Sequence, residues 1–227
     1  MNVLVFGATG AIGEATAAKL EEQGARVITS SRSPGDAELH VDPAGAPETL
    51  SVLDGLRSLG AVVWAQGTNV NDSAHTVDTE GFATVMGANV GFIVVTLQRL
   101  LAAACLSEGA SLVMVSSIWE TLARPGKFSY AVSKAAVGGL VRAASADLAN
   151  DGYRVNAVLP GVTDTPMTRS VLTSDRIAAV ERAVGFDRLV TLDEVASTIA
   201  WLCSSASSGI SGQSLAVDLG FSNVRDI

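Results

Sequence analysis

The stretch Asn2-Val-Leu-Val-Phe6, followed at once by Gly7-Ala-Thr-Gly10-Ala-Ile-Gly13, decides the fold of this 227-residue chain. The first five residues form a short apolar run, which indicates a buried strand, and a helical stretch over Glu14–Gln23 follows the glycine-rich turn. Backbone N–H groups at such a helix start point toward an anion, and glycines let the chain approach a pyrophosphate closely. The alternative is a tight connection without a ligand, but the turn's place after the first strand favours a phosphate cradle. The predicted cradle residues are Gly7, Thr9, Gly10, Ala11 and Ile12.

Strand and helix signals alternate along the rest of the chain. The expected strands are Val3–Phe6, Arg26–Ser30, Glu38–Val41, Ala61–Ala65, Ser111–Ser116, Arg154–Leu159 and Ser214–Asp218. The expected helices are Ala11–Gln23, Pro47–Leu56, Thr79–Ala104, Ser129–Asn150, Thr173–Ala183 and Leu192–Ser204. This alternation predicts an α/β fold over residues 1–227, a single-domain doubly wound (Rossmann-like) parallel sheet with helices on both faces. Ligands bind beyond the carboxyl ends of such strands, where Gly7, Ser31, Ser117 and Pro160 fall.

A tyrosine and a lysine lie four residues apart in Tyr130-Ala-Val-Ser-Lys134, on the expected helix Ser129–Asn150. Residues i and i+4 share one helix face, so the phenol and the ammonium can point into one site. We expect the cation to lower the tyrosine pKa from its usual value of about 10, which makes Tyr130 a proton donor and acceptor. Ser117 would present its hydroxyl at the end of the preceding strand. The three groups suit the task of holding a carbonyl oxygen during proton transfer, although the alternative is an ordinary exposed helix pair.

In their order and spacing these residues resemble the short-chain dehydrogenases/reductases of the compact, single-domain kind. The resemblance rests on the glycine turn, Ser117, Tyr130, Lys134 and Pro160-Gly161, and it continues to Ile210–Asp218. It implies an enzyme that moves a hydride between a nicotinamide cofactor and a small-molecule carbonyl or alcohol, with Tyr130 as general acid and base. Lys134 would also bind the nicotinamide ribose.

Further residue roles follow from this resemblance alone. Asn89 would hold a water on Lys134 that reprotonates Tyr130, or it makes only a polar contact to a neighbouring loop. Asp42 would contact the adenine amino group, or it only starts a turn before Pro43. Thr163 would meet the nicotinamide amide and Thr165 the pyrophosphate. The loops with Ala65, Gly67 and Pro160 complete the expected cofactor site.

The end of the second strand, Thr29-Ser-Ser-Arg-Ser33, indicates which cofactor binds. An acidic residue there would accept hydrogen bonds from the ribose 2′-OH and repel a 2′-phosphate. Here Arg32 can bind phosphate oxygens with its forked guanidinium, and Ser31 can donate a further hydrogen bond. In the resembling family this pair accompanies NADP(H), which is therefore the expected cofactor. The alternatives are that Arg32 is a solvated loop charge and that the enzyme is an NAD-dependent alcohol dehydrogenase.

Four positions depart from the family pattern. Phe6 replaces a threonine before the first glycine, and Ala11 takes the place of the middle glycine, with Gly10 one position earlier. An expected Asn-Asn-Ala-Gly run is Trp64-Ala-Gln-Gly67, and a glycine pair near the carboxyl end is Leu219-Gly220. The missing threonine and asparagine usually tie two loops together, so we expect a different cofactor affinity or loop order. A non-catalytic nucleotide sensor on the same fold is therefore an alternative, against which the intact Ser117, Tyr130 and Lys134 argue.

Composition excludes several other classes. A net charge of −8 and a pI near 4.7 argue against a nucleic-acid partner. Polar residues such as Arg99 interrupt every apolar run, so no run is expected to approach membrane-spanning length. The amino terminus has no basic start followed by a long apolar stretch, so no secretory signal is expected. Cys105 and Cys203 read as small core residues, and His40 and His75 are isolated, so we expect no metal site. These features predict a cytoplasmic protein.

The sequence predicts the substrate pocket in less detail than the cofactor site. The segment Pro166–Arg188 reads as a mobile lid, whose pocket walls would be Met167, Val171, Leu172 and Ile177. Trp119 would form the pocket floor or pack in the core. A 3-oxoacyl reductase, a small-ketone reductase and a sugar reductase all fit, whereas a methyl-donor enzyme would leave the Tyr–Lys pair unexplained.

The expected helices Thr79–Ala104 and Ser129–Asn150 carry more small and apolar residues than one buried face requires. Small residues allow a symmetry-related helix to approach closely, and helices at these places in the resembling family often form subunit contacts. We therefore predict a homodimer or a homotetramer.

Overall fold

The computed structural model describes residues 1–223, except for the side chains of Met167 and Val171. Seven parallel strands form one sheet in the order β3-β2-β1-β4-β5-β6-β7. Their bounds are β1 Asn2–Phe6, β2 Arg26–Ser31, β3 Leu39–His40, β4 Leu59–Trp64, β5 Leu106–Val115, β6 Arg154–Pro160 and β7 Ser214–Val217. The expected α/β fold is confirmed, and each expected strand is present within a few residues of its predicted bounds.

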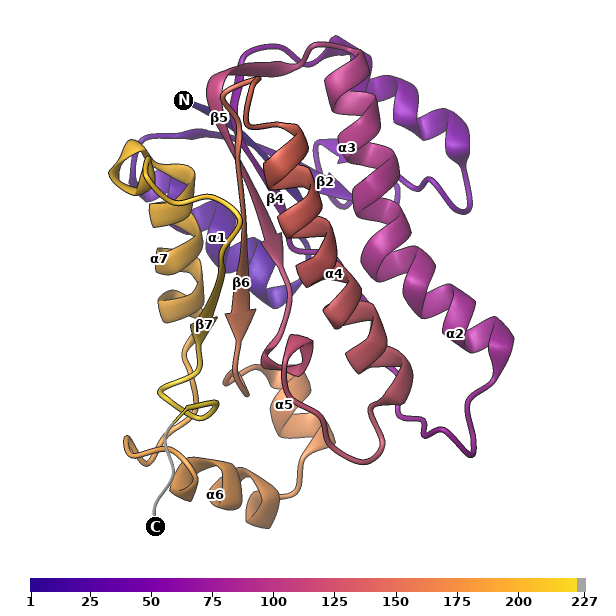
Figure 1. Cartoon of the computed structure of the whole chain (residues 1–227), viewed down its shortest axis with the longest axis vertical. Helices are drawn as coiled ribbons and strands as arrows, with labels where there is room; N and C mark the ends of the chain where they lie inside the picture. The colour runs from indigo at the N-terminus through magenta and orange to yellow at the C-terminus, as the bar shows by residue number, and fades with distance from the viewer. Residues whose placement is uncertain (224–227) are drawn as a thin grey trace.

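Helices cover both faces of this sheet (Figure 1). One face carries α1 Ala11–Glu22 and α7 Leu192–Cys203, and the other carries α2 Thr79–Met86, α3 Phe92–Ala102 and α4 Phe128–Asp147. Two short helices, α5 Pro166–Val171 and α6 Ser174–Arg182, lie beyond the carboxyl ends of β6 and β7 (Figure 1). The expected helix Pro47–Leu56 is a short 3-10 helix, η1 Pro47–Gly55. Two further 3-10 turns are η3 Ile118–Glu120 and η4 Ser205–Ser207.

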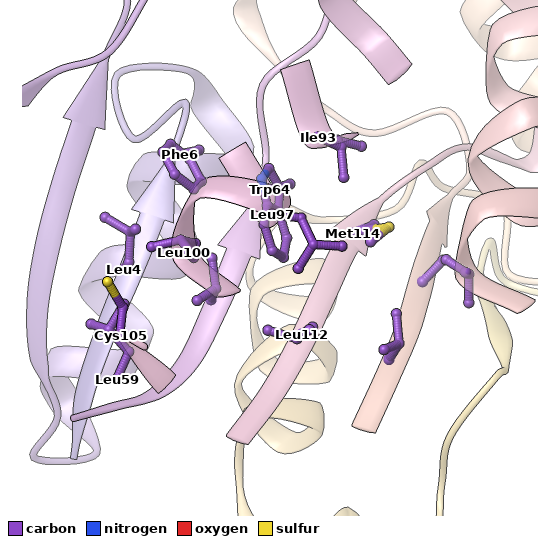
Figure 2. Packing of buried hydrophobic residues seen from close by; sticks show 14 of the residues in the cluster. Leu4, Phe6, Leu59, Trp64, Ile93, Leu97, Leu100, Cys105, Leu112 and Met114 are labelled. Atoms are coloured by element: carbon purple, nitrogen blue, oxygen red, sulfur yellow. The ribbon is translucent and has the colours of Figure 1, made fainter. Parts of the chain in front are cut away.

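Alternation of side chains along β1 divides the core into two layers. Val3 and Val5 pack toward α1 and α7, whereas Leu4 and Phe6 pack toward α3 and α4. In the second layer the rings of Phe6 and Trp64 stack with their centroids 5.8 Å apart (Figure 2). The Trp64 indole N–H donates to the Thr96 hydroxyl at 2.9 Å, so its polar atom is satisfied in the core.

This aromatic stack joins the two loops that the family's threonine and asparagine usually tie together. The Ala65 N–H also donates to the Phe6 carbonyl at 2.9 Å. The loops after β1 and β4 therefore lie side by side, held by ring packing and one backbone hydrogen bond. The contact between Phe6 and Trp64 thus joins the two loops in place of the missing threonine and asparagine.

The long helix over Thr79–Ala102 is continuous but contains a π-helical turn, η2 Gly87–Gly91, between α2 and α3. It has 24 residues, and an 18-residue window within it has a mean hydropathy of 1.6, so it reaches the length and apolarity of a membrane span. The expectation that no run approaches that length was therefore wrong. A core helix of a soluble protein can be equally long and apolar. In this helix, Ile93, Leu97 and Leu100 pack in the core beside Trp64 (Figure 2).

Candidate active site

Three side chains meet at the carboxyl edge of the sheet, where β5 ends and α4 begins. Ser117 lies two residues after the end of β5, and its hydroxyl shares a hydrogen bond with the Tyr130 phenol. Lys134 lies one turn further along α4, with its ammonium 5.6 Å from the centroid of the Tyr130 ring. The same ammonium donates to the Val115 carbonyl at 3.0 Å, so the end of β5 holds it. The structure thus brings together the hydroxyl, the phenol and the ammonium that the sequence pointed to.

The expected direction of the Tyr130 pKa was wrong. Burial raises this pKa above its usual value, and the hydrogen bond from Ser117 offsets the rise only in part. Lys134 donates to Val115 rather than to the phenol oxygen, and burial lowers its own pKa to about 8, against the attraction of the Glu120 carboxylate. At neutral pH the site therefore holds a neutral phenol beside a protonated lysine, which suits Tyr130 to donate a proton.

Asn89 lies in the π-helical turn, a local widening that often marks a functional position. Its Oδ1 accepts from the Thr68 N–H at 2.7 Å, and its Nδ2 donates to the Thr68 carbonyl and the Ser133 hydroxyl. This is the polar contact to a neighbouring loop that was the alternative. Gly67 separates Asn89 from Lys134, because a Cβ added there would lie 3.1 Å from Asn89 Oδ1 and 3.8 Å from Lys134 Nζ. The water-holding role stays a prediction.

The glycine turn after β1 has the geometry of an anion cradle. Gly7 has φ +73°, and a Cβ there would lie 2.5 Å from the Gln66 backbone nitrogen. Gly10 is the N-cap of α1 and provides no side-chain hydrogen bond, so the first N–H groups of that helix, those of Ala11 and Ile12 among them, have no capping partner within the described part of the chain. The side-chain amide of Gln66 is buried beside this turn without a hydrogen-bond partner among the described residues. An uncapped helix start and an orphaned amide fit the phosphates of a dinucleotide.

The end of β2 carries the residues that would choose between the two nicotinamide cofactors. Ser31 is buried, and its oxygen accepts from the Ser33 N–H at 3.0 Å. Arg32 is exposed and makes no ion pair within residues 1–223. Asp42 begins a turn, because its N–H donates to Thr49 Oγ1 at 2.8 Å and its carbonyl accepts from Ala46. The geometry at Asp42 is thus that of the turn-starting alternative, and an adenine contact stays a prediction.

The loop after β6 places Pro160 at the end of that strand, with Thr163 and Thr165 following. Thr163 is buried and pairs with Val190, and the Thr165 hydroxyl caps α5 by accepting from the Thr168 N–H at 3.0 Å. Their cofactor contacts stay predictions. The expected lid is built of α5 and α6 (Figure 1), with Leu172 and Ile177 half-buried. The side chains of Met167 and Val171 lie outside the described residues.

One charged residue near the site was missed by sequence reasoning. The Lys127 ammonium is buried and lies 5.6 Å from the Tyr130 ring centroid, matching the distance of Lys134. Its spacing of three residues before Tyr130 could have revealed it, because i and i+3 share a helix face. Trp119 is half-buried with the Arg124 guanidinium 5.5 Å from its ring centroid, and it is not part of either core layer. Core packing of Trp119, one of the two expectations, was wrong.

The chain is similar to several named oxidoreductases. The family model described as Enoyl-(Acyl carrier protein) reductase matches residues 44–222. A glucose 1-dehydrogenase from Gluconobacter oxydans is 28% identical over 248 residues, spanning 99% of this chain and 93% of the relative. A 3-oxoacyl-(acyl-carrier-protein) reductase from Thermotoga maritima is 30% identical over 96% of both chains. The solved gluconate 5-dehydrogenase from Burkholderia cenocepacia, in complex with NADP and tartrate, shares the fold with a TM-score of 0.90 at 22% identity, over 99% of this chain and 96% of that one.

Proposed function

The chain belongs to the short-chain dehydrogenase/reductase family, and on that premise we propose that it interconverts a ketone or aldehyde with its alcohol using NADP(H). Membership of the family makes it an oxidoreductase acting on alcohol or carbonyl groups with a nicotinamide cofactor. The observation that carries the proposal is the joined Ser117, Tyr130 and Lys134 beside an uncapped glycine cradle.

Each of the three side chains has a task in this reaction. The cofactor, when bound, supplies or accepts the hydride. Tyr130 gives its phenol proton to the substrate oxygen during reduction and takes it back during oxidation. Ser117 holds the same oxygen through its hydroxyl as negative charge develops there. Lys134 stabilises that charge from behind the phenol while the Val115 carbonyl fixes its ammonium.

The direct test is a panel of ketones, aldehydes and alcohols, each assayed with NADPH, NADH and their oxidised forms by the absorbance of the reduced nicotinamide. We expect turnover in both directions on at least one carbonyl–alcohol pair, with NADP(H) preferred. Cofactor binding without turnover on any substrate would support the nucleotide sensor instead.

The cofactor choice predicts a specific loss for Arg32→Ala. Since Arg32 is exposed and unpaired within residues 1–223, its guanidinium is free to bind a 2′-phosphate. We expect NADPH binding to weaken by about 1.5–3 kcal/mol, the usual scale of a charged hydrogen bond, with NADH binding almost unchanged. Calorimetric titration of both cofactors into both proteins measures this, and an equal loss for both would make Arg32 a surface charge.

The lowered Lys134 pKa predicts the pH dependence of carbonyl reduction. Lys134 is protonated below about pH 8 and loses its charge above it. Reduction needs that charge together with the neutral phenol, whose pKa is raised. We therefore expect kcat/KM for reduction to be level at neutral pH and to fall above about pH 8. A profile that stays level to the end of the protein's stable range would contradict this role of Lys134.

An oligomer is expected from the apolar outer face of α3 and α4. Val94, Val95, Phe128 and Val132 are 38–49% exposed on this face, although they are large apolar side chains. We expect light scattering to give a dimer or tetramer at micromolar concentration, and Val94→Glu to shift it toward the monomer because a carboxylate would be buried at the contact. A monomeric wild-type protein would leave this face unexplained.

A cytoplasmic location stays a prediction from the sequence.

A further inference from the structure

Three residues of one α4 face line the site in a row. Lys127 is the N-cap of α4, and Tyr130 and Lys134 follow at i+3 and i+7, a spacing that keeps side chains on one helix face. Both ammonium groups lie 5.6 Å from the Tyr130 ring centroid. The Lys134 ammonium donates to the Val115 carbonyl at the end of β5. The Lys127 ammonium contacts the loop after β4 instead, about one helical turn nearer the helix start.

Lys127 is buried, and no carboxylate among residues 1–223 is hydrogen-bonded to it. It is 6% exposed, and its ammonium donates to Asn69 Oδ1 at 2.7 Å and to Asn71 Oδ1 at 2.8 Å. Both partners are neutral amides, so they satisfy two of its three donors without cancelling its charge. Burial lowers its pKa and the nearby Arg124 lowers it further, whereas the Asp72 carboxylate raises it in part. Burying a cation among neutral groups costs folding free energy, because the charge loses its hydration. This cost indicates that Lys127 has a functional role.

Two carboxylates lie close enough to these lysines to act on their charge, but neither forms an ion pair with Lys127 among the described residues. Asp72 accepts from the Ser129 N–H at 2.9 Å and from the Ser129 hydroxyl. Glu120 lies beside Gly138 on α4 and attracts Lys134, and its Oε2 is buried without a hydrogen-bond partner among the described residues. Arg124 adds a second cation on the segment between Ser117 and Tyr130, with its guanidinium over the Trp119 ring and no ion pair within residues 1–223. Asp72 attracts Lys127 and Glu120 attracts Lys134, so these two carboxylates offset part of the positive charge of Lys127, Lys134 and Arg124 and leave one positive charge in excess among these five groups.

We propose that this site takes carbonyl and alcohol substrates that carry a carboxylate, and that Lys127 binds the carboxylate while Arg124 attracts it at the entrance. The proposal rests on the proposed function, and it narrows the substrate to an oxo acid or a hydroxy acid. The remaining donor of Lys127 makes a charge-assisted hydrogen bond to the carboxylate. Its distance from the Tyr130 ring places that carboxylate beside the carbonyl oxygen that Tyr130 and Ser117 hold.

The test measures binding, so that it does not depend on turnover. Levulinate and acetoacetate, and the methyl ester of each, are titrated calorimetrically into the protein saturated with its oxidised nicotinamide cofactor, which cannot reduce them. We expect at least one acid to bind roughly 10- to 100-fold more tightly than its ester, the scale of one charged hydrogen bond. Lys127→Gln should remove this preference by weakening only the acid. Its amide can still donate to Asn69 or Asn71, which protects the fold. Lys127→Arg should retain much of the preference.

Lys19→Gln is the matched control, because Lys19 on α1 pairs with Glu22 of the same helix and with Asp193 on α7, and it is no part of the site. It should leave the acid preference unchanged. Equal affinity of acid and ester in the wild-type protein, or no binding of either acid, would overturn the proposal. So would an equal loss for acid and ester in Lys127→Gln, since Lys127 would then only fix the loop. A protein that reduces only neutral ketones would contradict the proposal of a carboxylate-bearing substrate but would agree with the proposed oxidoreductase function. A protein that binds the acids but turns over no carbonyl compound would contradict the proposed reaction and leave the proposed carboxylate binding in place.

Discussion

Replacing Tyr130 with phenylalanine is expected to remove nearly all turnover while cofactor binding stays within a few-fold of the wild-type value. The phenyl ring keeps the packing between Lys127 and Lys134, so only the hydroxyl that shares a hydrogen bond with Ser117 is lost. General acid and base catalysis contributes about 10²- to 10⁴-fold to a rate, and kcat should fall on that scale. Steady-state assays on a substrate found in the panel, with cofactor titrations in parallel, measure both quantities.

Tyr153→Phe provides the control, since Tyr153 is the other tyrosine of the chain and packs at the margin of the core layer that contains Trp64. It should leave kcat unchanged. Lys134→Ala should harm turnover and cofactor binding together, because its ammonium stands between Val115 and the phenol. Near-normal turnover by the Tyr130 variant on an authentic substrate would refute the mechanism.

Much of the fold was readable because its strands are apolar runs between polar turns. β5 was the exception, since it begins at Leu106 rather than at Ser111. The additional residues include exposed Glu108 and Gly109, and the pairing with β4 shifts register there, so no local pattern marked them as strand. α5 also escaped prediction, because six residues are too few to show a helical period and its cap at Thr165 is visible only with the fold in hand.

The site divides in the same way between local and tertiary information. The spacing of Tyr130 and Lys134 is local, so the sequence sufficed to place both on one helix face. The direction of the Tyr130 pKa depends on burial, which the surrounding fold determines, and the sequence indicated the opposite direction. Lys127 had a readable spacing, but its partners Asn69 and Asn71 lie 58 and 56 residues away in the chain. Without them Lys127 reads as an exposed lysine at a helix start.

The glycine turn gives the second large expected effect, through Gly7→Ala. Gly7 has φ +73°, and an added Cβ would lie 2.5 Å from Gln66 N, 2.7 Å from Gln66 Cα and 2.9 Å from the Ala65 carbonyl carbon. All three atoms are backbone, so the loop after β4 has to move away from the turn. The left-handed conformation costs an alanine about 1–2 kcal/mol, and overpacking adds about 1–3 kcal/mol. We expect a clear fall in the melting temperature and a loss of most cofactor affinity, because the cradle opens.

Gly24→Ala separates these two costs. Gly24 has φ +80°, close to that of Gly7, but an added Cβ there meets no atom within 4 Å. It should therefore show the conformational cost alone, a fall of roughly 2–4 °C per kcal/mol, with cofactor affinity unchanged. Thermal unfolding and NADPH titration of both variants test the difference. If the two alanines lowered the melting temperature equally and both kept NADPH binding, the close approach of Gly7 to Gln66 would not be what shapes the cradle. If only Gly7→Ala lost NADPH binding, the cofactor site would depend on the close contact between the loops after β1 and β4, the same two loops that the Phe6–Trp64 stack joins.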